Sequence, residues 1–201
     1  DTNKPLGEIE QVEHTYAVIG NMNEHQLTVV ESTWGGRPEL VDTTGIIDYG
    51  SLMQLALERA KTAREAIKVM TGLVKKYGYY SSGESFTIAD PNEAWILDLI
   101  GKGPGRRGAV WVAVRIPDDC IAGHANYPRI HKIPMDDKEN CLYSPDVISF
   151  AREMGYFDGL NKDFSFARAY SPADFGALRA CDARVWSFFR KYDSTMDNYL
   201  P

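Results

Sequence analysis

Cysteine is scarce in this sequence. Three cysteines among 201 residues are too few for the disulfide framework of a small secreted domain, and their odd number prevents complete pairing within the chain. This count is typical of a reducing compartment and is also compatible with an exported protein that keeps free thiols, so the sequence assigns no location. A chain of this length buries enough surface to fold without disulfides or a bound metal.

Long apolar runs and basic character are also lacking. No apolar stretch approaches the roughly 20 residues of a membrane-spanning helix, so we expect no membrane span. Lysine and arginine number 22 against 28 acidic residues, which gives a formal net charge of −6. This acidic balance argues against binding to nucleic acid or to an anionic membrane surface, because both select basic faces.

The overall composition is that of an ordinary globular protein, with 44% hydrophobic and 25% charged residues. Such values exclude a disordered chain, a coiled coil and a collagen. The sequence also contains no internal repeat and no low-complexity linker. We therefore expect a single domain over residues 1–201.

Two helices are predicted between residues 48 and 76. Apolar residues recur there at helical spacing in two separate stripes. The capping sequence Thr62-Ala63-Arg64-Glu65 marks the start of the second helix, because a threonine side chain accepts from the amide three residues later. Gly78 ends it, since glycine readily adopts the backbone conformation found beyond a helix C-terminus.

Short β-forming segments account for much of the remaining chain. Polar turns separate them, which predicts antiparallel pairing between neighbours. We predict a hairpin of residues 16–19 and 27–30 around a turn at 21–26, with Trp34 opening the next loop. The other predicted strands form a meander of residues 85–89, 94–100 and 109–116, with residues 120–125 as a candidate fourth strand.

Two further helices close the chain. Each is predicted to begin at a Ser-Pro pair, Ser144-Pro145 or Ser171-Pro172, which suits an N-cap followed by the first helical residue. The last helix runs to about Tyr192, and its apolar stripe predicts a buried face that includes Cys181. Strands grouped with strands and helices with helices predict an α+β fold of antiparallel sheets with packed helices.

Cofactor and metal motifs are weak. The glycine-rich run 101–108 enters a predicted strand, whereas a phosphate-binding loop must open a helix. The four histidines show no helical two-ligand spacing. Cys120 and His124 are four residues apart in a predicted strand, where their side chains are separated along one face. We expect neither a cofactor nor a metal.

None of the three cysteines has the neighbours of a nucleophile. Two aspartates precede Cys120, and their negative charge raises the pKa of a thiol and weakens it as a nucleophile. Pairing of Cys120 with His124 or His131 stays open as an alternative. Cys141 and Cys181 are predicted to be structural.

Two asparagines and one arginine are candidate catalytic residues. Asn23 lies in a polar turn, and Asn126 follows the candidate fourth strand. Asparagine is common in turns, which is the simpler interpretation of both, but its side-chain N–H also stabilises an oxyanion in acyl transfer. Arg184 lies at the edge of the last apolar stripe, where it either packs its stem or orients a catalytic group.

Several separated motifs together resemble those of one enzyme family, the PepD-type dipeptidases. These are cysteine-type N-terminal-nucleophile hydrolases related to secernins. The motifs follow one another in the family's order over nearly the whole chain. They are Gln11-Val12-Glu13-His14-Thr15-Tyr16, Asn21-Met22-Asn23-Glu24-His25-Gln26-Leu27, Gly83-Glu84-Ser85-Phe86-Thr87-Ile88-Ala89-Asp90-Pro91-Asn92-Glu93-Ala94-Trp95, Gly123-His124-Ala125-Asn126 and Ala183-Arg184-Val185-Trp186.

The resemblance implies a four-layer αββα sandwich that hydrolyses dipeptides, so that small peptides are the binding partners. It places an oxyanion-stabilising asparagine at Asn23 and a second asparagine, for substrate or oxyanion, at Asn126. An arginine that steadies the nucleophile region is placed at Arg184, with Arg179 as a rival.

The same resemblance implies a substrate pocket and a nucleophile. Glu84 and His124 lie in matched motifs and are expected to line the pocket. In the family, a cysteine at the mature N-terminus attacks the substrate carbonyl, with its own α-amino group as the base. Asp1 stands first here, so we expect this sequence to be the central part of a longer dipeptidase whose nucleophile lies upstream.

Two consequences and two alternatives follow from this prediction. The isolated 201 residues are expected to be inactive, and a fragment of a layered sandwich exposes apolar surface, so self-association is expected. One alternative is a non-catalytic member of the same fold that binds peptides or a protein partner. A second alternative is a hydrolase that uses Cys120 as its nucleophile.

Overall fold

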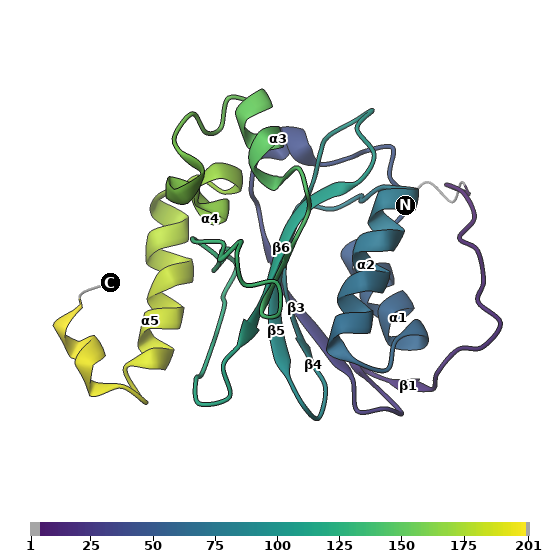
Figure 1. Cartoon of the computed structure of the whole chain (residues 1–201), viewed down its shortest axis with the longest axis horizontal. Helices are drawn as coiled ribbons and strands as arrows, with labels where there is room; N and C mark the ends of the chain where they lie inside the picture. Colours follow the sequence, from purple (N-terminus) through teal and green to yellow (C-terminus); the bar gives the residue numbers. More distant parts are fainter. Residues whose placement is uncertain (1–4, 200–201) are drawn as a thin grey trace.

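The strands of the computed structural model, which describes residues 5–199, form one antiparallel sheet (Figure 1). Each strand pairs with the next one in sequence, so the sheet has the simplest meander order. The seven strands are β1 (Val18–Ile19), β2 (Met22–Asn23), β3 (Thr28–Trp34), β4 (Gly83–Ala89), β5 (Ala94–Gly101), β6 (Ala109–Ile116) and β7 (Cys141–Tyr143).

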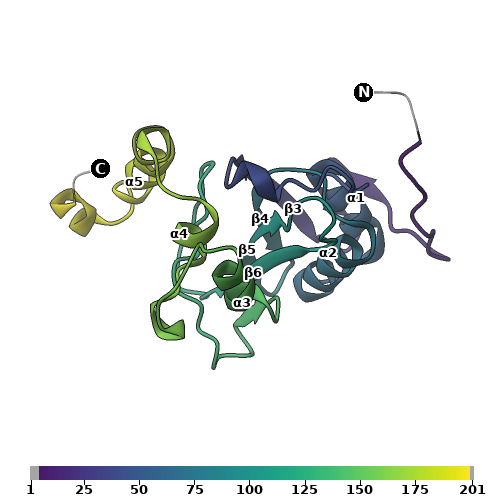
Figure 2. The ribbon, with the colours of Figure 1, turned by 90° about the horizontal axis from the view of Figure 1, so that it is seen from above.

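Helices cover both faces of the sheet (Figure 2). The main helices are α1 (Tyr49–Arg59), α2 (Ala63–Tyr77), α3 (Val147–Glu153), α4 (Phe166–Tyr170) and α5 (Ala183–Phe189). Single turns and irregular helix are η1 (Pro38–Leu40), η2 (Asn161–Asp163), the π-helical segment η3 (Ala177–Asp182) and η4 (Ser194–Asn198). Within residues 5–199, no helix combines the length and the apolar character that crossing a membrane requires.

Two apolar cores lie on opposite faces of the sheet. Alternate residues of a strand point to opposite faces, so Phe86 and Leu97 pack against α1 and α2 on one side. Ile96 and Val112 pack against α3 and α4 on the other side. The predicted α+β class is therefore confirmed. The described residues form a single sheet, and the second sheet of a four-layer sandwich stays an expectation.

The two predicted N-terminal helices are confirmed, including the residues that separate them. Thr62 is the N-cap of α2, and its hydroxyl oxygen accepts from the Glu65 amide at 3.2 Å. The Glu65 carboxylate accepts from the Lys61 amide at 2.8 Å and thus satisfies a further donor at the helix start. Gly78 caps the other end with φ of +78°, where a Cβ would lie 2.7 Å from the Gly45 Cα.

The meander of β4, β5 and β6 is confirmed, whereas the predicted N-terminal hairpin is wrong in its pairing. Residues 16–19 and 27–30 do not pair with each other, because β2 lies between them and pairs with both β1 and β3. The Asn23 side chain explains the difference, since its Oδ1 accepts from the amides of His25 and Leu27 and closes a tighter turn. Trp34 ends β3 and is buried, instead of opening a loop.

The candidate fourth strand at residues 120–125 is also wrong. A turn from Pro117 to Cys120 leads the chain away from the end of β6, and residues 117–131 form a loop. The place beside β6 is taken by β7, in which Cys141 pairs with Val114. The short segment of residues 141–143 lacks a periodic pattern, because only three residues form its ladder.

The Ser-Pro pairs do not start the last two helices. The Ser144 hydroxyl oxygen accepts from the Trp111 amide, and α3 begins later with Asp146 as its N-cap. Ser171 ends the unpredicted helix α4, and the next helical segment begins where Asp174 accepts from the Ala177 amide at 2.7 Å.

The apolar stripe of the last helix is largely exposed, contrary to the prediction. Phe175 is 80% exposed and Leu178 is 52% exposed, whereas Val185 is buried. Cys181 is half-buried and does not belong to either apolar core. A π-helical segment contains more residues per turn than an α-helix, so the sequence spacing from 177 to 182 does not give the face on which each side chain lies.

Candidate active site

A loop crosses the end of β3 and brings two of the predicted residues together. The Asn126 backbone amide donates to the Ser32 hydroxyl at 3.2 Å, and its side-chain Nδ2 donates to the Thr33 carbonyl at 2.5 Å. Arg184 from α5 donates through Nη2 to the Asn126 Oδ1 at 2.9 Å and to the Ala125 carbonyl at 3.2 Å. The contact between Asn126 and Arg184 joins positions 58 residues apart in sequence.

Arg184 fixes which way the asparagine amide faces. A guanidinium only donates, so its contact with Oδ1 turns the NH₂ group of Asn126 toward β3. One N–H of that group is used by the Thr33 carbonyl, and the second has no hydrogen-bond partner among the described residues. Asn126 has φ of +54°, a left-handed conformation that asparagine tolerates better than most residues.

The end of β3 also presents an unpaired backbone edge. Within residues 5–199, β2 pairs with β3 only through Met22 and Thr28. The Val29 amide donates to the Asn21 carbonyl, and the Asn21 side-chain Nδ2 donates to the Val29 carbonyl. The odd-numbered residues of β3 therefore direct their backbone groups away from β4. The N–H and C=O of one residue in an antiparallel strand point to the same side. The Thr33 N–H therefore faces the same edge as the Thr33 carbonyl that Asn126 reaches.

His124 attaches the loop to the face of the sheet opposite α1 and α2. Its Nδ1 lies 2.5 Å from the Ser32 hydroxyl and its Nε2 lies 2.8 Å from the Thr87 hydroxyl. Burial lowers the pKa of His124, so the imidazole is neutral near neutral pH. Each ring nitrogen is hydrogen-bonded to one hydroxyl, so this histidine attaches the loop to the sheet.

Glu84 lies on the other face of the sheet and does not share a pocket wall with His124. It is opposite Thr33 in the strand register, and the Thr33 hydroxyl donates to the Glu84 Oε1 at 2.8 Å and approaches the Glu31 Oε2 at 3.3 Å. Glu84 is fully buried, and its Oε2 has no partner. Burial, followed by the neighbouring Glu31, raises the pKa of Glu84 to about 9, so the group is protonated at neutral pH.

Asp98 was missed in the sequence analysis. It is fully buried in β5, and its Oδ2 accepts from the amides of Arg129 and Ile130, each at 2.9 Å. The Ser85 hydroxyl donates to its Oδ1 at 2.5 Å. Burial raises the pKa of Asp98 to about 6, while these donors oppose the shift. The available signal was a lone carboxylate within the otherwise apolar strand at residues 94–100.

Asn23 is not brought to the other predicted residues. Its Nδ2 donates to the carbonyls of Leu57 and Ala60 at the end of α1, each at 2.8 Å. Its Oδ1 accepts from two amides in the turn before β3. These four contacts occupy both amide hydrogens and both lone pairs. The observed role of the Asn23 side chain is to join this turn to α1.

The cysteines lie outside the cluster around Asn126. Desolvation and the adjacent Asp119 raise the pKa of the exposed Cys120 thiol. Burial raises the pKa of Cys141 to about 11. In the part of the chain that the structure describes, no three histidine, cysteine or acidic side chains are grouped as metal ligands.

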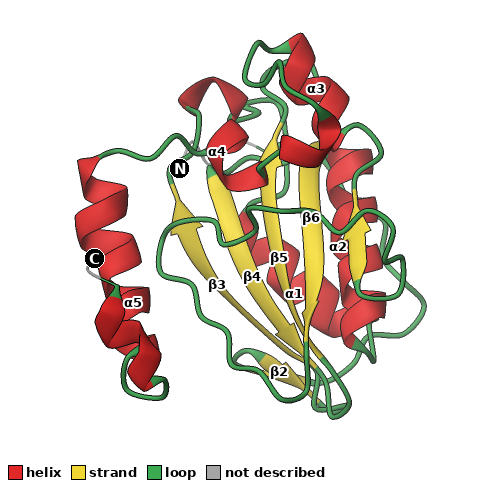
Figure 3. Ribbon diagram, turned by 60° about the vertical axis from the view of Figure 1, so that its left-hand side comes forward, coloured by secondary structure: helices red, strands yellow, loops and turns green. Residues whose placement is uncertain are grey.

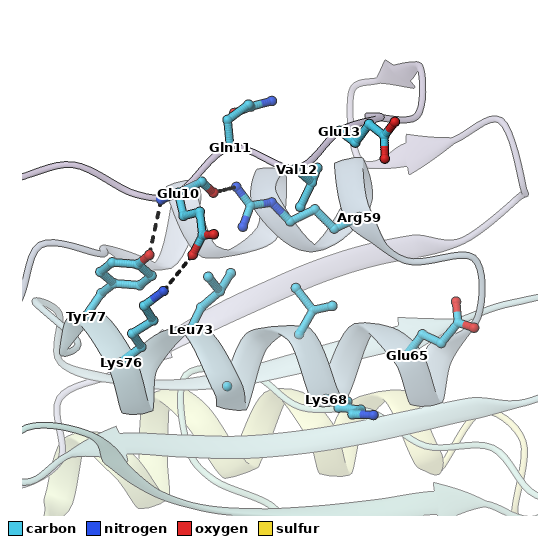
Figure 4. A pocket seen from close by; sticks show the side chains of 12 residues that line it. Glu10, Gln11, Val12, Glu13, Arg59, Glu65, Lys68, Leu73, Lys76 and Tyr77 are labelled. Atoms are coloured by element: carbon cyan, nitrogen blue, oxygen red, sulfur yellow. Dashed lines mark hydrogen bonds and ion pairs between the residues drawn. The ribbon is translucent and has the colours of Figure 1, made fainter.

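A groove of about 740 Å³ lies elsewhere, between the N-terminal arm and the helices α1 and α2 (Figure 4). The Lys76 ammonium pairs with Glu10 of the arm at 2.8 Å, and the Tyr77 hydroxyl accepts from the Glu10 amide. The lining residues of this groove include none of the predicted site residues.

Comparison with known proteins places the chain in a family. The family model described as peptidase family C69 matches residues 1–200. The chain belongs to peptidase family C69. A probable dipeptidase of Salmonella dublin is 29% identical over 181 residues, which are 87% of this chain and 40% of that protein.

Two further relatives carry similar names. A probable dipeptidase of Latilactobacillus sakei is 35% identical over 100 residues, covering 50% of this chain and 20% of the relative. Probable dipeptidase B of Streptococcus pyogenes serotype M1 is 28% identical over 122 residues, covering 61% of this chain and 23% of the relative. The chain thus spans less than half the length of each of these three relatives.

Replacement of Asn23 by alanine is expected to lower the free energy of unfolding by about 3 kcal/mol, because it leaves buried carbonyls and amides without partners. Urea denaturation measures this loss, and Asn92→Ala, in an exposed turn, is the control. A loss of turnover with unchanged stability would contradict the structural role and restore Asn23 as an oxyanion donor.

Replacement of Asp98 by alanine is expected to cost about 3–5 kcal/mol, because two backbone amides and one hydroxyl lose a buried acceptor. Amide hydrogen exchange of residues 123–130 should accelerate in this variant. Asp136→Ala is the control, since Asp136 is exposed. Unchanged exchange in that loop would show that Asp98 does not anchor it.

Replacement of Glu84 by glutamine is expected to change the pH dependence of stability. The folded-state pKa of about 9 lies above the ordinary 4.5, so the folded protein holds the proton more tightly than the unfolded chain. Stability from this group is present at low pH and is lost as pH rises toward 9, with a slope of at most about 1.4 kcal/mol per pH unit. Glu84→Gln should remove that slope in urea denaturation at pH 5, 7 and 9. The same dependence of unfolding free energy on pH in both proteins would contradict the raised pKa of Glu84.

Proposed function

We propose that the whole protein hydrolyses dipeptides, with a cysteine thiol as the nucleophile. Membership of peptidase family C69 and the names of the three relatives support a peptidase that acts on dipeptides. The observation that carries the proposal is the contact between Arg184 and Asn126 at the unpaired edge of β3. This contact presents an oriented amide donor beside a backbone amide, as an acyl-transfer site requires.

The nucleophile in this proposal is a cysteine at the mature N-terminus, outside the 201 residues. The α-amino group of such a residue has a pKa near neutrality and accepts the thiol proton. Two cysteines of the chain support this placement by their own environments, since the thiol pKa values of Cys120 and Cys141 are both raised. A raised pKa leaves less thiolate at neutral pH.

The residues described here would then act on the oxygen of the attacked carbonyl. The thiolate sulfur bonds to the carbonyl carbon, and the carbonyl π electrons move onto its oxygen. The Asn126 Nδ2 lies against the Thr33 carbonyl at the edge of β3. Its second N–H and the N–H of Thr33 would donate to this oxyanion. Collapse of the intermediate breaks the C–N bond, and the departing amine takes the proton. Water hydrolyses the thioester to release the second product.

The other predicted residues have positioning roles in this proposal. Arg184 orients the Asn126 amide and does not touch the substrate. Arg179, its rival, lies in the exposed π-helical segment. His124 holds the loop on the sheet through two hydroxyls. Asn23 as the oxyanion donor is the less supported placement, because all of its hydrogen-bonding positions are occupied.

Two alternatives and an assembly proposal need separate tests. A non-catalytic peptide-binding protein would bind dipeptides without hydrolysing them. A hydrolase based on Cys120 would show much faster alkylation of Cys120 than of Cys141, which its raised pKa disfavours. Self-association of the isolated 201 residues is supported by Phe175 and Leu178, whose exposure supplies an apolar surface.

The decisive kinetic experiment uses the full-length protein and hydrolysis of alanyl-alanine. Asn126→Ala is expected to lower kcat on the order of 10²–10³-fold, the usual effect of one lost oxyanion donor. Arg184→Lys should also lower kcat, because an ammonium cannot reproduce a guanidinium whose Nε donates to the Ala180 carbonyl while Nη2 donates to Asn126 and Ala125. Arg190→Lys, at the C-terminal cap of α5, is the control.

Iodoacetamide labelling with mapping of the modified residue completes this experiment. Selective alkylation of an N-terminal cysteine with loss of activity would support the proposed nucleophile. Full activity of Asn126→Ala, or complete inactivation by alkylation of Cys120 alone, would contradict the proposal.

A further inference from the structure

We propose that Glu31, supported by Thr33 and Glu84, forms the subsite that binds the free α-ammonium group of the substrate. This inference rests on the proposed function and deepens it, because an ammonium subsite next to the reacting carbonyl selects peptides with a free N-terminus. The family match and the names of the relatives assign no residue to that task.

The three side chains lie on one face of the sheet. Glu31 and Thr33 are alternate residues of β3, and Glu84 is directly opposite Thr33 on β4. The Thr33 hydroxyl lies 2.8 Å from the Glu84 Oε1 and 3.3 Å from the Glu31 Oε2. Thr33 therefore links both carboxyl groups. Glu31 is half-buried and reachable from solvent, whereas Glu84 is fully buried beneath it.

Nothing in residues 5–199 neutralises these two acids. Neither Glu31 nor Glu84 takes part in an ion pair in that part of the chain. No donor of the described residues reaches the buried Glu84 Oε2, and besides Thr33 the group hydrogen-bonded to this carboxyl is the second acid, Glu31. The other titratable groups coupled to these acids are Tyr79, which lies near both of them, and His124, which lies near Glu31 and is kept neutral by burial. None of these groups carries a positive charge, so a cation is the missing complement.

Thr33 also connects this acidic site with the proposed reaction centre. Its backbone carbonyl accepts from the Asn126 side chain, while its hydroxyl contacts the two acids. In a dipeptide the amino nitrogen and the scissile carbonyl carbon are separated by two bonds, about 2.5 Å. A substrate whose carbonyl oxygen lies at the edge of β3 thus has its ammonium group close to that edge, and Glu31, two residues before Thr33 on the same strand, is an acid that solvent reaches.

The protonation state of Glu84 is consistent with a site that binds a cation. Without a ligand, Glu84 holds a proton because of burial and the nearby Glu31. An ammonium group at this place favours the ionised form of both acids. Binding of a free-amino ligand should therefore release a proton at neutral pH, and an N-acetylated ligand should not.

The test uses the full-length protein and a dipeptide isostere that cannot be hydrolysed. The probes are the hydroxyethylene isostere of alanyl-alanine and its N-acetyl derivative, titrated by calorimetry. Glu31→Gln is expected to weaken binding of the free-amino probe about 10–100-fold, as loss of a charge-assisted contact does. It should leave the N-acetyl probe unchanged. Glu139→Gln, an exposed acid with the same change in charge, is the control.

Several outcomes would overturn the inference. Equal losses for both probes, or no loss in Glu31→Gln, would show that Glu31 does not recognise the ammonium group. Failure of the wild-type protein to prefer the free-amino probe would do the same. Binding that follows the expected pattern, in a protein that hydrolyses no dipeptide, would support the subsite and contradict only the proposed hydrolysis.

Discussion

A buried carboxylate on the central strand β5 holds the loop that carries Asn126. Asp98 accepts from two consecutive backbone amides of that loop and from Ser85 on the neighbouring strand. Amides at residues 129 and 130 have no ladder to join, because the loop passes over the sheet instead of pairing with it. Without this acceptor the amides would be buried and unsatisfied, so the position of the loop depends on one charged side chain in an apolar strand.

The strand β3 then organises the candidate site through its backbone and both of its faces. Ser32 receives His124 on the face that packs against α3 and α4. Thr33 presents its hydroxyl to Glu84 on the face toward α1 and α2, and its backbone to Asn126 at the edge. Figure 3 shows β3 near the side of the sheet where α5, which carries Arg184, stands. The two faces and the edge of β3 are thus all used by two adjacent residues, Ser32 and Thr33.

Two titratable groups of this region, His124 and Glu84, are kept neutral by burial instead of being charged and held in ion pairs. His124 is clamped between hydroxyls with a lowered pKa, and Glu84 holds its proton with a raised one. Neutral forms avoid the large free-energy cost of burying charge without a partner. The charged residue Arg184 is exposed, and it works on Asn126 from the solvent side through an oriented hydrogen bond.

Local sequence signals determined much of this protein. Helical spacing and the cap at Thr62 placed α1 and α2, and alternation between polar turns placed β4, β5 and β6, because these features depend on neighbours in sequence. Motif likeness also selected Asn126 and Arg184, which the fold brings into contact. Only the tertiary structure decided that Asn23 closes a turn against α1, that Glu84 and His124 lie on opposite faces, and that Asp98 anchors the loop. Those assignments depend on which backbone groups remain unpaired after packing, and contacts between residues 31 to 92 positions apart leave no periodic trace in the sequence.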